Sequence, residues 1–336
     1  MDDNFSYFYS RILDLSAAGS IATKPLCIYI IITRTPKYMR TVSYFILNEL
    51  LWNTIGNAFY TLAHPLPMMP ATCFRMDGVI AHLLTTEEHR CIYFIAIVVT
   101  VLNCCLGFVT TFAFRYVTLA FHSTISNIHT VWAYVLCTLF HLITSIVVVV
   151  LFLMWRLPIS EYPQGDLPES TSNLFCFHPQ GVEINIVAAV FLVYFFASTL
   201  IVFVLAGLTL RELRIQKHLM ERRTAFLQRA MLKNLTIITG NALLLGGLPL
   251  SVVVFYIYNG HLPYARKITS GLFLITLNFG TLYAILILCL FKAYRRAVAN
   301  IVKSLLKLLE SVVGAGQSSN IISSNSAPYV VNNVRY

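Results

Sequence analysis

Residues whose types could do chemistry are few in this chain, and they do not form the spacings that catalysis needs. The 336 residues include eight Cys and nine His, but no Cys-x-x-Cys pair and no Cys/His spacing typical of zinc. The motifs His-Glu-x-x-His and Gly-x-Ser-x-Gly, which indicate a metalloprotease or a serine hydrolase, are absent. We therefore expect no metal, no cofactor and no enzymatic activity.

Two ionisable residues stand out because they lie in or at the end of long apolar stretches. Glu49 interrupts one stretch and Arg115 ends another. A charge in a membrane helix is costly, so it either has a function inside the protein or reaches the membrane interface. For Glu49 we favour the second reading, in which its side chain lies near the inner interface and extends toward Lys37 or Arg40.

The overall composition is that of a membrane protein. Hydrophobic residues make up 57% of the chain and charged residues 11%. A soluble domain has about 25% charged residues, and this chain has too few to cover a water-exposed surface. The net charge of +10 comes from short basic runs between apolar stretches, so it does not indicate a nucleic-acid partner.

Seven stretches are long and apolar enough to cross a bilayer, which takes about 20 residues each. They are Ile12–Thr33, Val42–Ala63, Cys91–Thr118, Val131–Met154, Ile184–Leu208, Leu235–Tyr258 and Ile268–Phe291. We predict an all-α membrane protein, a seven-transmembrane helix bundle, in which Pro249 kinks the sixth helix. No internal repeat of the transporter kind is present.

The distribution of basic residues predicts the orientation. With the N-terminus outside, 17 of the 24 Lys and Arg residues fall on the cytoplasmic side, as the positive-inside rule requires. Seven of the 17 lie in the third inner loop, from Arg211 to Lys233. The glycosylation sequon at Asn4 agrees with an outer N-terminus. We expect a multi-pass plasma-membrane protein with a cytoplasmic C-terminus.

The region after the seventh span is amphipathic. Apolar residues recur at helical spacing in Lys292–Glu310, and Arg295, Arg296, Lys303 and Lys307 supply positive charge. Such a helix suits the anionic inner leaflet, although it could instead pack on another protein. The rest is rich in Ser, Asn and Gly, so we expect a folded domain over residues 1–311 and a disordered tail over 312–336.

Several short motifs carry a resemblance to a known family. They are Thr35 to Val42 with Asn48 and Trp52, the proline-rich His64 to Pro70, Phe114-Arg115-Tyr116, Gln228 to Leu232, and Tyr294-Arg295. Over Leu13 to Arg296 the chain resembles G-protein-coupled receptors, in particular nematode serpentine chemoreceptors of class H, with classes D and I as alternatives. Asn57 stands where many such receptors carry an acid.

The resemblance implies a chemosensory receptor, expected in sensory cilia, with a small-molecule ligand and a heterotrimeric G protein as partners. Arg115, Tyr116 and Arg295 would then form the coupling surface. The alternative for Arg115 is a simple interfacial anchor.

The ligand site is expected on the third span. Helical steps from Arg115 place Phe94, Ile97 and Val101 on one face. All three are apolar, so an amine would find no acid there, and a small uncharged ligand is predicted. Ordinary core packing fits the same residues.

A disulfide is predicted between Cys91 and Cys176. Cys91 lies 24 residues before Arg115, or about 36 Å along a helix, which places it at the outer surface. Cys176 lies in the long second outer loop, and both face an oxidising compartment. Cys73 is a competing partner.

The main alternative function is a seven-helix transporter or channel. Transporters show Gly- and Pro-interrupted spans, and only Gly246 to Pro249 looks interrupted here. Nucleotide dependence separates the two classes, because GTP lowers the agonist affinity of a receptor but not of a transporter.

Overall fold

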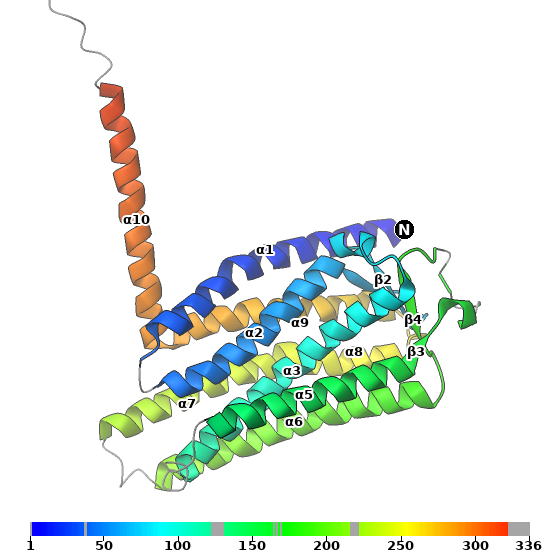
Figure 1. Cartoon of the computed structure of the whole chain (residues 1–336), viewed down its shortest axis with the longest axis horizontal. Coiled ribbons are helices and arrows are strands. Elements are labelled where there is room, and N and C mark those ends of the chain that lie inside the picture. Colours follow the sequence, from blue (N-terminus) through cyan, green and yellow to red (C-terminus); the bar gives the residue numbers. More distant parts are fainter. Residues whose placement is uncertain are drawn as a thin grey trace, which may run out of the picture.

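Long helices dominate the computed structural model, which describes residues 2–36, 39–121, 131–163, 165, 167–168, 170–215 and 222–321 (Figure 1). Side chains are described for these residues except 2–3, 222–225, 308–309 and 311–321. Of the predicted inner loop Phe121–His129, only Phe121 is among the described residues. Lys37, part of the third inner loop and the last part of the tail also lie outside the described residues.

Seven helical spans run side by side along one bundle (Figure 1). They are α1 (Asp2–Arg34), α2 (Arg40–Ala63), α3 (Glu87–Ala120), α5 (Val131–Trp155), α6 (Val182–Ile215), α7 (Arg222–Ala242) continued by α8 (Leu248–Tyr258), and α9 (Ala265–Leu290). Six of the spans are long and apolar enough to cross a membrane. The remaining one, α2, is less apolar because it carries Glu49 and three Asn. The predicted fold class is confirmed.

The sixth span is irregular where the sequence predicted a kink. A π-helical turn, η6 (Leu243–Gly247), separates α7 from α8, and Pro249 is the second residue of α8. Proline has no backbone N–H, and its ring crowds the carbonyl group four residues earlier, so a wider turn is a natural response.

A small antiparallel sheet, which the sequence analysis did not predict, covers one end of the bundle (Figure 1). Its strand order is β1 (Pro65–Pro67), β2 (Cys73–Met76), β4 (Leu174–Phe177) and β3 (Arg156–Leu157). A one-turn helix, η2 (Val79–His82), follows β2, and another, η3 (Ile159–Glu161), follows β3. We call this the sheet end of the bundle, and the opposite end the α10 end.

The sheet is tied to the helices by charge as well as by packing. Arg156 Nη1 in β3 lies 2.7 Å from Glu88 Oε1 in the first turn of α3. This carboxylate raises the pKa of Arg156 above its ordinary value.

The disulfide joins Cys73 to Cys176, so the predicted pair Cys91–Cys176 is wrong. Cys73 and Cys176 face each other across the β2–β4 ladder. Cys91 is a free thiol, buried near the start of α3. The number of residues between Cys91 and Arg115 correctly placed Cys91 at the sheet end of the bundle. It could not reveal that β2 pairs with β4.

Cys73→Ala and Cys176→Ala should each impair surface expression, whereas Cys91→Ala should not. The bond closes a separation of 103 residues, and loss of a native disulfide costs about 2–5 kcal/mol. Flow cytometry of tagged protein measures expression, and mass spectrometry of unreduced peptides identifies the pair. A peptide linking Cys91 to Cys176 would contradict the structure.

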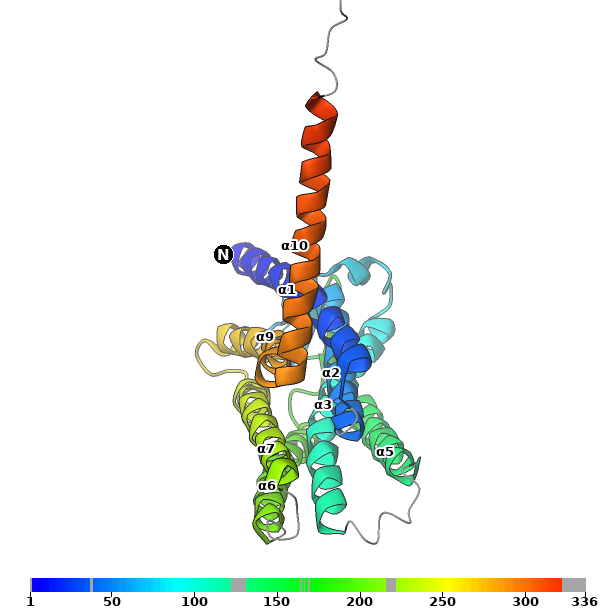
Figure 2. The same ribbon diagram turned by 90° about the vertical axis from the view of Figure 1, so that its left-hand side faces the viewer.

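The helix after the seventh span, α10 (Lys292–Ile321), leaves the bundle almost at a right angle to it (Figure 1). Figure 2 views this end, where α6 and α7 lie on one side, α5 on the other, and α10 extends beyond the bundle. The amphipathic helix is thus present, and it continues past the boundary predicted at residue 311. Residues 322–336 of the predicted tail lie outside the described part of the chain.

Candidate functional site

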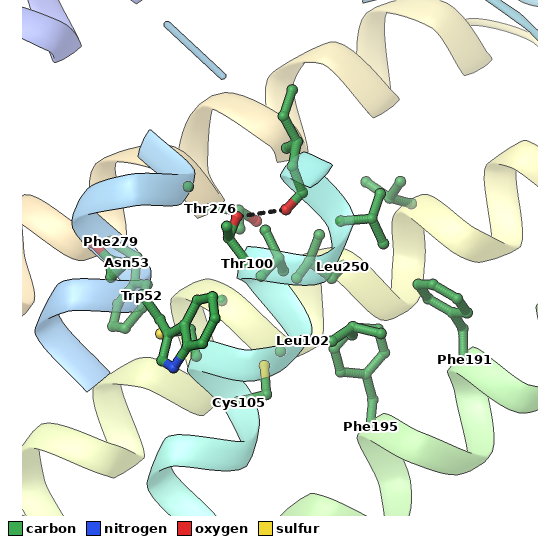
Figure 3. Close-up of a pocket in the computed structure, with 18 of the residues that line it drawn as sticks. Trp52, Asn53, Thr100, Leu102, Cys105, Phe191, Phe195, Leu250, Thr276 and Phe279 are labelled. Carbon is green, nitrogen blue, oxygen red and sulfur yellow. Dashed lines mark hydrogen bonds between the residues drawn. The ribbon is translucent and has the colours of Figure 1, made fainter. Parts of the chain in front are cut away.

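A cavity of about 160 Å³ lies inside the bundle toward its sheet end (Figure 3). Helices α2, α3, α5, α6, α8 and α9 all contribute to its wall. The three residues predicted for the ligand site, Phe94, Ile97 and Val101, line it together. The spacing along α3 therefore places these side chains on one wall, as expected. No Asp, Glu, Lys or Arg is among the residues that line the cavity.

Aromatic side chains close the cavity at the sheet end. The rings of Phe74 in β2 and Phe94 in α3 lie 4.6 Å apart between centroids, and Trp155 stacks on Phe177 of β4 at 4.5 Å. Phe74, Phe94 and Trp155 also line the cavity. The sheet is thus an apolar lid, and contacts of this kind contribute about 0.5–1.5 kcal/mol each beyond the area that they bury.

Helices α2 and α9 form a polar wall of the cavity, and Ser198 and Thr199 of α6 add further polar groups to the lining. Asn53 and Asn57 of α2 and Thr276 of α9 line it, and each has a buried oxygen without a hydrogen-bond partner among the described residues (Figure 3). The sequence analysis missed these residues as site candidates. The signal that could have revealed them is the run of three Asn in a membrane span.

Glu49 lies in the core of the bundle, on the α10 side of the cavity. Its exposed fraction is 0%, and the hydroxyl groups of Thr111 (α3) and Tyr283 (α9) both donate to its carboxylate. The prediction that it extends toward Lys37 or Arg40 at the inner interface is therefore wrong. Glu49 instead joins three helices through one buried hydrogen-bonded group.

Lys24 of α1 is also buried, although the orientation count treated it as an outer basic residue. Its exposed fraction is 0%, and its Nζ lies 3.5 Å from the backbone oxygen of Asn53. Among the described residues, a completely buried acid, Glu49, and a completely buried base, Lys24, thus lie on the neighbouring helices α2 and α1. A buried charge persists in a membrane protein only where the surrounding groups compensate it.

A second polar cluster joins α2, α3 and α5. His141 of α5 lies 3.0 Å from Asn48 Nδ2 and 2.7 Å from Asn103 Oδ1, and Asn103 also donates to Ser145 at 2.9 Å. Such interhelical bonds align neighbouring spans in a bilayer. Asn48, one of the motif residues in the sequence, therefore helps to hold α2 against α5.

The residues predicted for G-protein coupling all lie at the α10 end. Arg115, at the end of α3, is 6% exposed, and its Nε and Nη2 have no hydrogen-bond partner among the described residues. Tyr116 is half-buried, with its ring edge-on to Phe121 at 6.3 Å. Arg295 is exposed at the start of α10, where Nη1 donates to the Cys289 carbonyl oxygen at 3.3 Å. The predicted glycosylation residue Asn4 is exposed at the other end, near the start of α1.

Comparison with known proteins decides the family. Residues 4–304 match the family of serpentine-type seven-transmembrane G-protein-coupled chemoreceptors known as Srh. The chain belongs to the Srh family. The protein is therefore a multi-span membrane receptor of the G-protein-coupled type and not an enzyme, and the family resemblance predicted from the short motifs is confirmed.

The fold of this Srh-family protein resembles that of squid rhodopsin. The crystal structure of squid rhodopsin superposes with a TM-score of 0.67 over 90% of this chain and 87% of that chain, at 13% sequence identity. This likeness shows a shared seven-helix fold. No curated protein matches the sequence.

Proposed function

We propose that this Srh-family receptor binds a small, uncharged, largely apolar molecule in the cavity and activates a heterotrimeric G protein at the α10 end. The observation that carries the proposal is a cavity inside the bundle without any charged lining residue, lined on the α3 side by Phe94, Ile97 and Val101. The cavity, of about 160 Å³, is comparable to an engineered apolar cavity of about 150 Å³ that binds benzene. The ligand is therefore of that size class.

The proposed orientation places the sheet end outside and the α10 end in the cytoplasm of a sensory cilium. The Cys73–Cys176 disulfide at the sheet end supports it, because disulfides persist in oxidising compartments. Helix α10 supports it as well. Val302, Leu305 and Leu306 are exposed there beside basic residues, which suits a helix lying on the anionic inner leaflet.

Coupling requires a basic surface that the G protein can reach once the helices move. Arg115 is buried and unpaired among the described residues, so it is free to bind a partner group in an active state. At the same end of the bundle, Arg211 and Arg214 of α6 and Arg229 and Lys233 of α7 add basic residues. Agonist would shift a two-state equilibrium toward the state that exposes Arg115.

Arg115→Ala should abolish signalling while surface expression and low-affinity ligand binding persist. The reason is that Arg115 would contact the G protein and not the ligand. A G-protein readout in cells, normalised to surface expression, measures the effect, and Arg296→Ala on the exposed face of α10 is the matched control. Normal signalling by Arg115→Ala would show that Arg115 is an interfacial anchor and does not take part in coupling.

The effect of GTP on agonist affinity tests the alternative that the protein is a transporter. In membranes containing the G protein, GTP should lower agonist affinity by a factor of about 5–150, the usual range of allosteric coupling. An affinity that does not respond to GTP, together with ligand uptake, would favour a transporter.

A further inference from the structure

Asn57 and Thr276 leave two polar atoms of the cavity wall unpaired. Asn57 is 6% exposed, and its Nδ2 donates to Ser20 Oγ of α1 at 3.1 Å, which leaves Oδ1 without a partner among the described residues. Thr276 Oγ1 is buried and equally unpaired there. Both residues line the cavity. A buried polar group without a hydrogen bond is costly, so these two atoms point to a missing partner.

The two groups lie at the same level on facing helices. A Cβ atom placed on Gly280 of α9 would lie 1.8 Å from Asn53 Oδ1, so α2 and α9 touch at this point. Helix α2 runs toward the sheet end and α9 away from it. Asn57 on α2 and Thr276 on α9 each lie about one helical turn nearer the sheet end than Asn53 and Gly280 do. Both then border the cavity from adjacent helices.

The hydroxyl groups of two cavity threonines, Thr100 and Thr276, differ in their hydrogen bonding. Thr100 Oγ1 donates to the Ile97 carbonyl oxygen of its own helix at 2.6 Å (Figure 3). Threonine in a helix commonly makes such a bond. Thr276 Oγ1 makes none among the described residues, so its hydroxyl keeps an unused donor and acceptor beside the cavity.

The chemistry of the two groups selects a ligand class. A hydrocarbon would leave both unpaired, and a ketone or ether could accept from Thr276 but could not donate to Asn57 Oδ1. An ammonium or carboxylate would find no counter-charge in the lining. A hydroxyl group can donate to Asn57 and accept from Thr276 at once.

We propose that the cavity is built for small alcohols, with the hydroxyl between Asn57 and Thr276 and the hydrocarbon part against the apolar wall. Phe191, Phe195 and Leu250 supply that wall on the α6 and α8 side (Figure 3). The inference rests on the ligand cavity of the proposed function and adds the functional group that the cavity recognises.

Direct binding tests this inference without any G protein. Two of the three Trp residues, Trp52 and Trp155, line the cavity, whereas Trp132 is exposed on α5. In a Trp132→Phe background, tryptophan fluorescence of receptor in lipid nanodiscs therefore reports occupancy. Benzyl alcohol, cyclohexanol and n-hexanol are titrated against ethylbenzene, methylcyclohexane and n-heptane, with empty nanodiscs correcting for partition into lipid.

At least one alcohol should bind about tenfold more tightly than its matched hydrocarbon, as one good hydrogen bond in a largely apolar site allows. Thr276→Val and Asn57→Leu should each remove this preference while hydrocarbon binding persists. Thr281→Val, the same change on α9 outside the cavity lining, should leave the preference unchanged. If Asn57→Leu fails to fold, Thr276→Val decides alone.

Equal binding of each alcohol and its hydrocarbon would overturn the inference, because a trapped water would then satisfy both groups. Absence of binding by all three alcohols would also overturn it. A retained alcohol preference in a protein that never activates a G protein would count against the proposed function and leave this inference standing.

Discussion

Glu49→Ala should lower the free energy of unfolding by about 2–6 kcal/mol, since two buried hydroxyl groups lose their acceptor at about 1–3 kcal/mol each. Thr111 of α3 and Tyr283 of α9 donate to the Glu49 carboxylate, which is completely buried. Three helices lose a shared contact, so the bundle should open at lower temperature. The thermal midpoint of purified receptor in detergent measures the loss.

Matched variants separate the hydrogen bonds from the change in volume. Glu49→Gln keeps the shape and one acceptor oxygen, so it should be less destabilised than Glu49→Ala. Tyr283→Phe and Thr111→Val each remove one donor, and in a Glu49→Ala background they should cost much less than alone, because the partners are in contact. Wild-type stability of Glu49→Ala would show that the carboxylate does not hold these helices together.

Gly280→Ala should be the most disruptive single methyl addition among the glycines of α9. The new Cβ would lie 1.8 Å from Asn53 Oδ1 and 2.6 Å from its Cγ, closer than such atoms can approach. Either the Asn53 side chain would have to rotate away or helices α2 and α9 would have to separate, and overpacking of this kind costs about 1–3 kcal/mol or more. Surface expression and the thermal midpoint should both fall.

Gly271→Ala is the matched control on the same helix, because its Cβ would meet no atom within 4 Å. It should be neutral or slightly stabilising, since alanine favours helix more than glycine does. Asn53→Ala should partly rescue Gly280→Ala by removing the clashing amide. Equal stability of the two alanine variants would mean that α2 and α9 do not touch at Gly280.

Glycines at the contacts between helices explain how the polar helix α2 fits into an apolar bundle. Gly107 of α3 receives Glu49, since a Cβ there would lie 2.7 Å from Glu49 Cγ. Gly56 of α2 lies equally close to Thr100, at 2.6 Å from Oγ1. Small residues let backbones approach, so polar side chains of α2 reach partners on adjacent helices and avoid lipid.

The sequence alone determined the class of the protein and most of its helices. Long apolar stretches with few charges have one stable solution, a bundle of membrane helices, because no other element satisfies its backbone inside lipid. The face of α3 that carries Phe94, Ile97 and Val101 was also predictable, since helical periodicity fixes which side chains share a wall. The motifs at the span ends were enough to predict the family.

Tertiary structure decided which residues meet across helices. Cys73 bonds to Cys176 because β2 pairs with β4, a register that short loop strands do not reveal in sequence. Glu49 is buried because α2 is rotated so that this residue faces Gly107 and Tyr283. The number of residues along a helix gives depth, but only packing against neighbours gives the rotation of each helix and therefore the partners of its polar side chains.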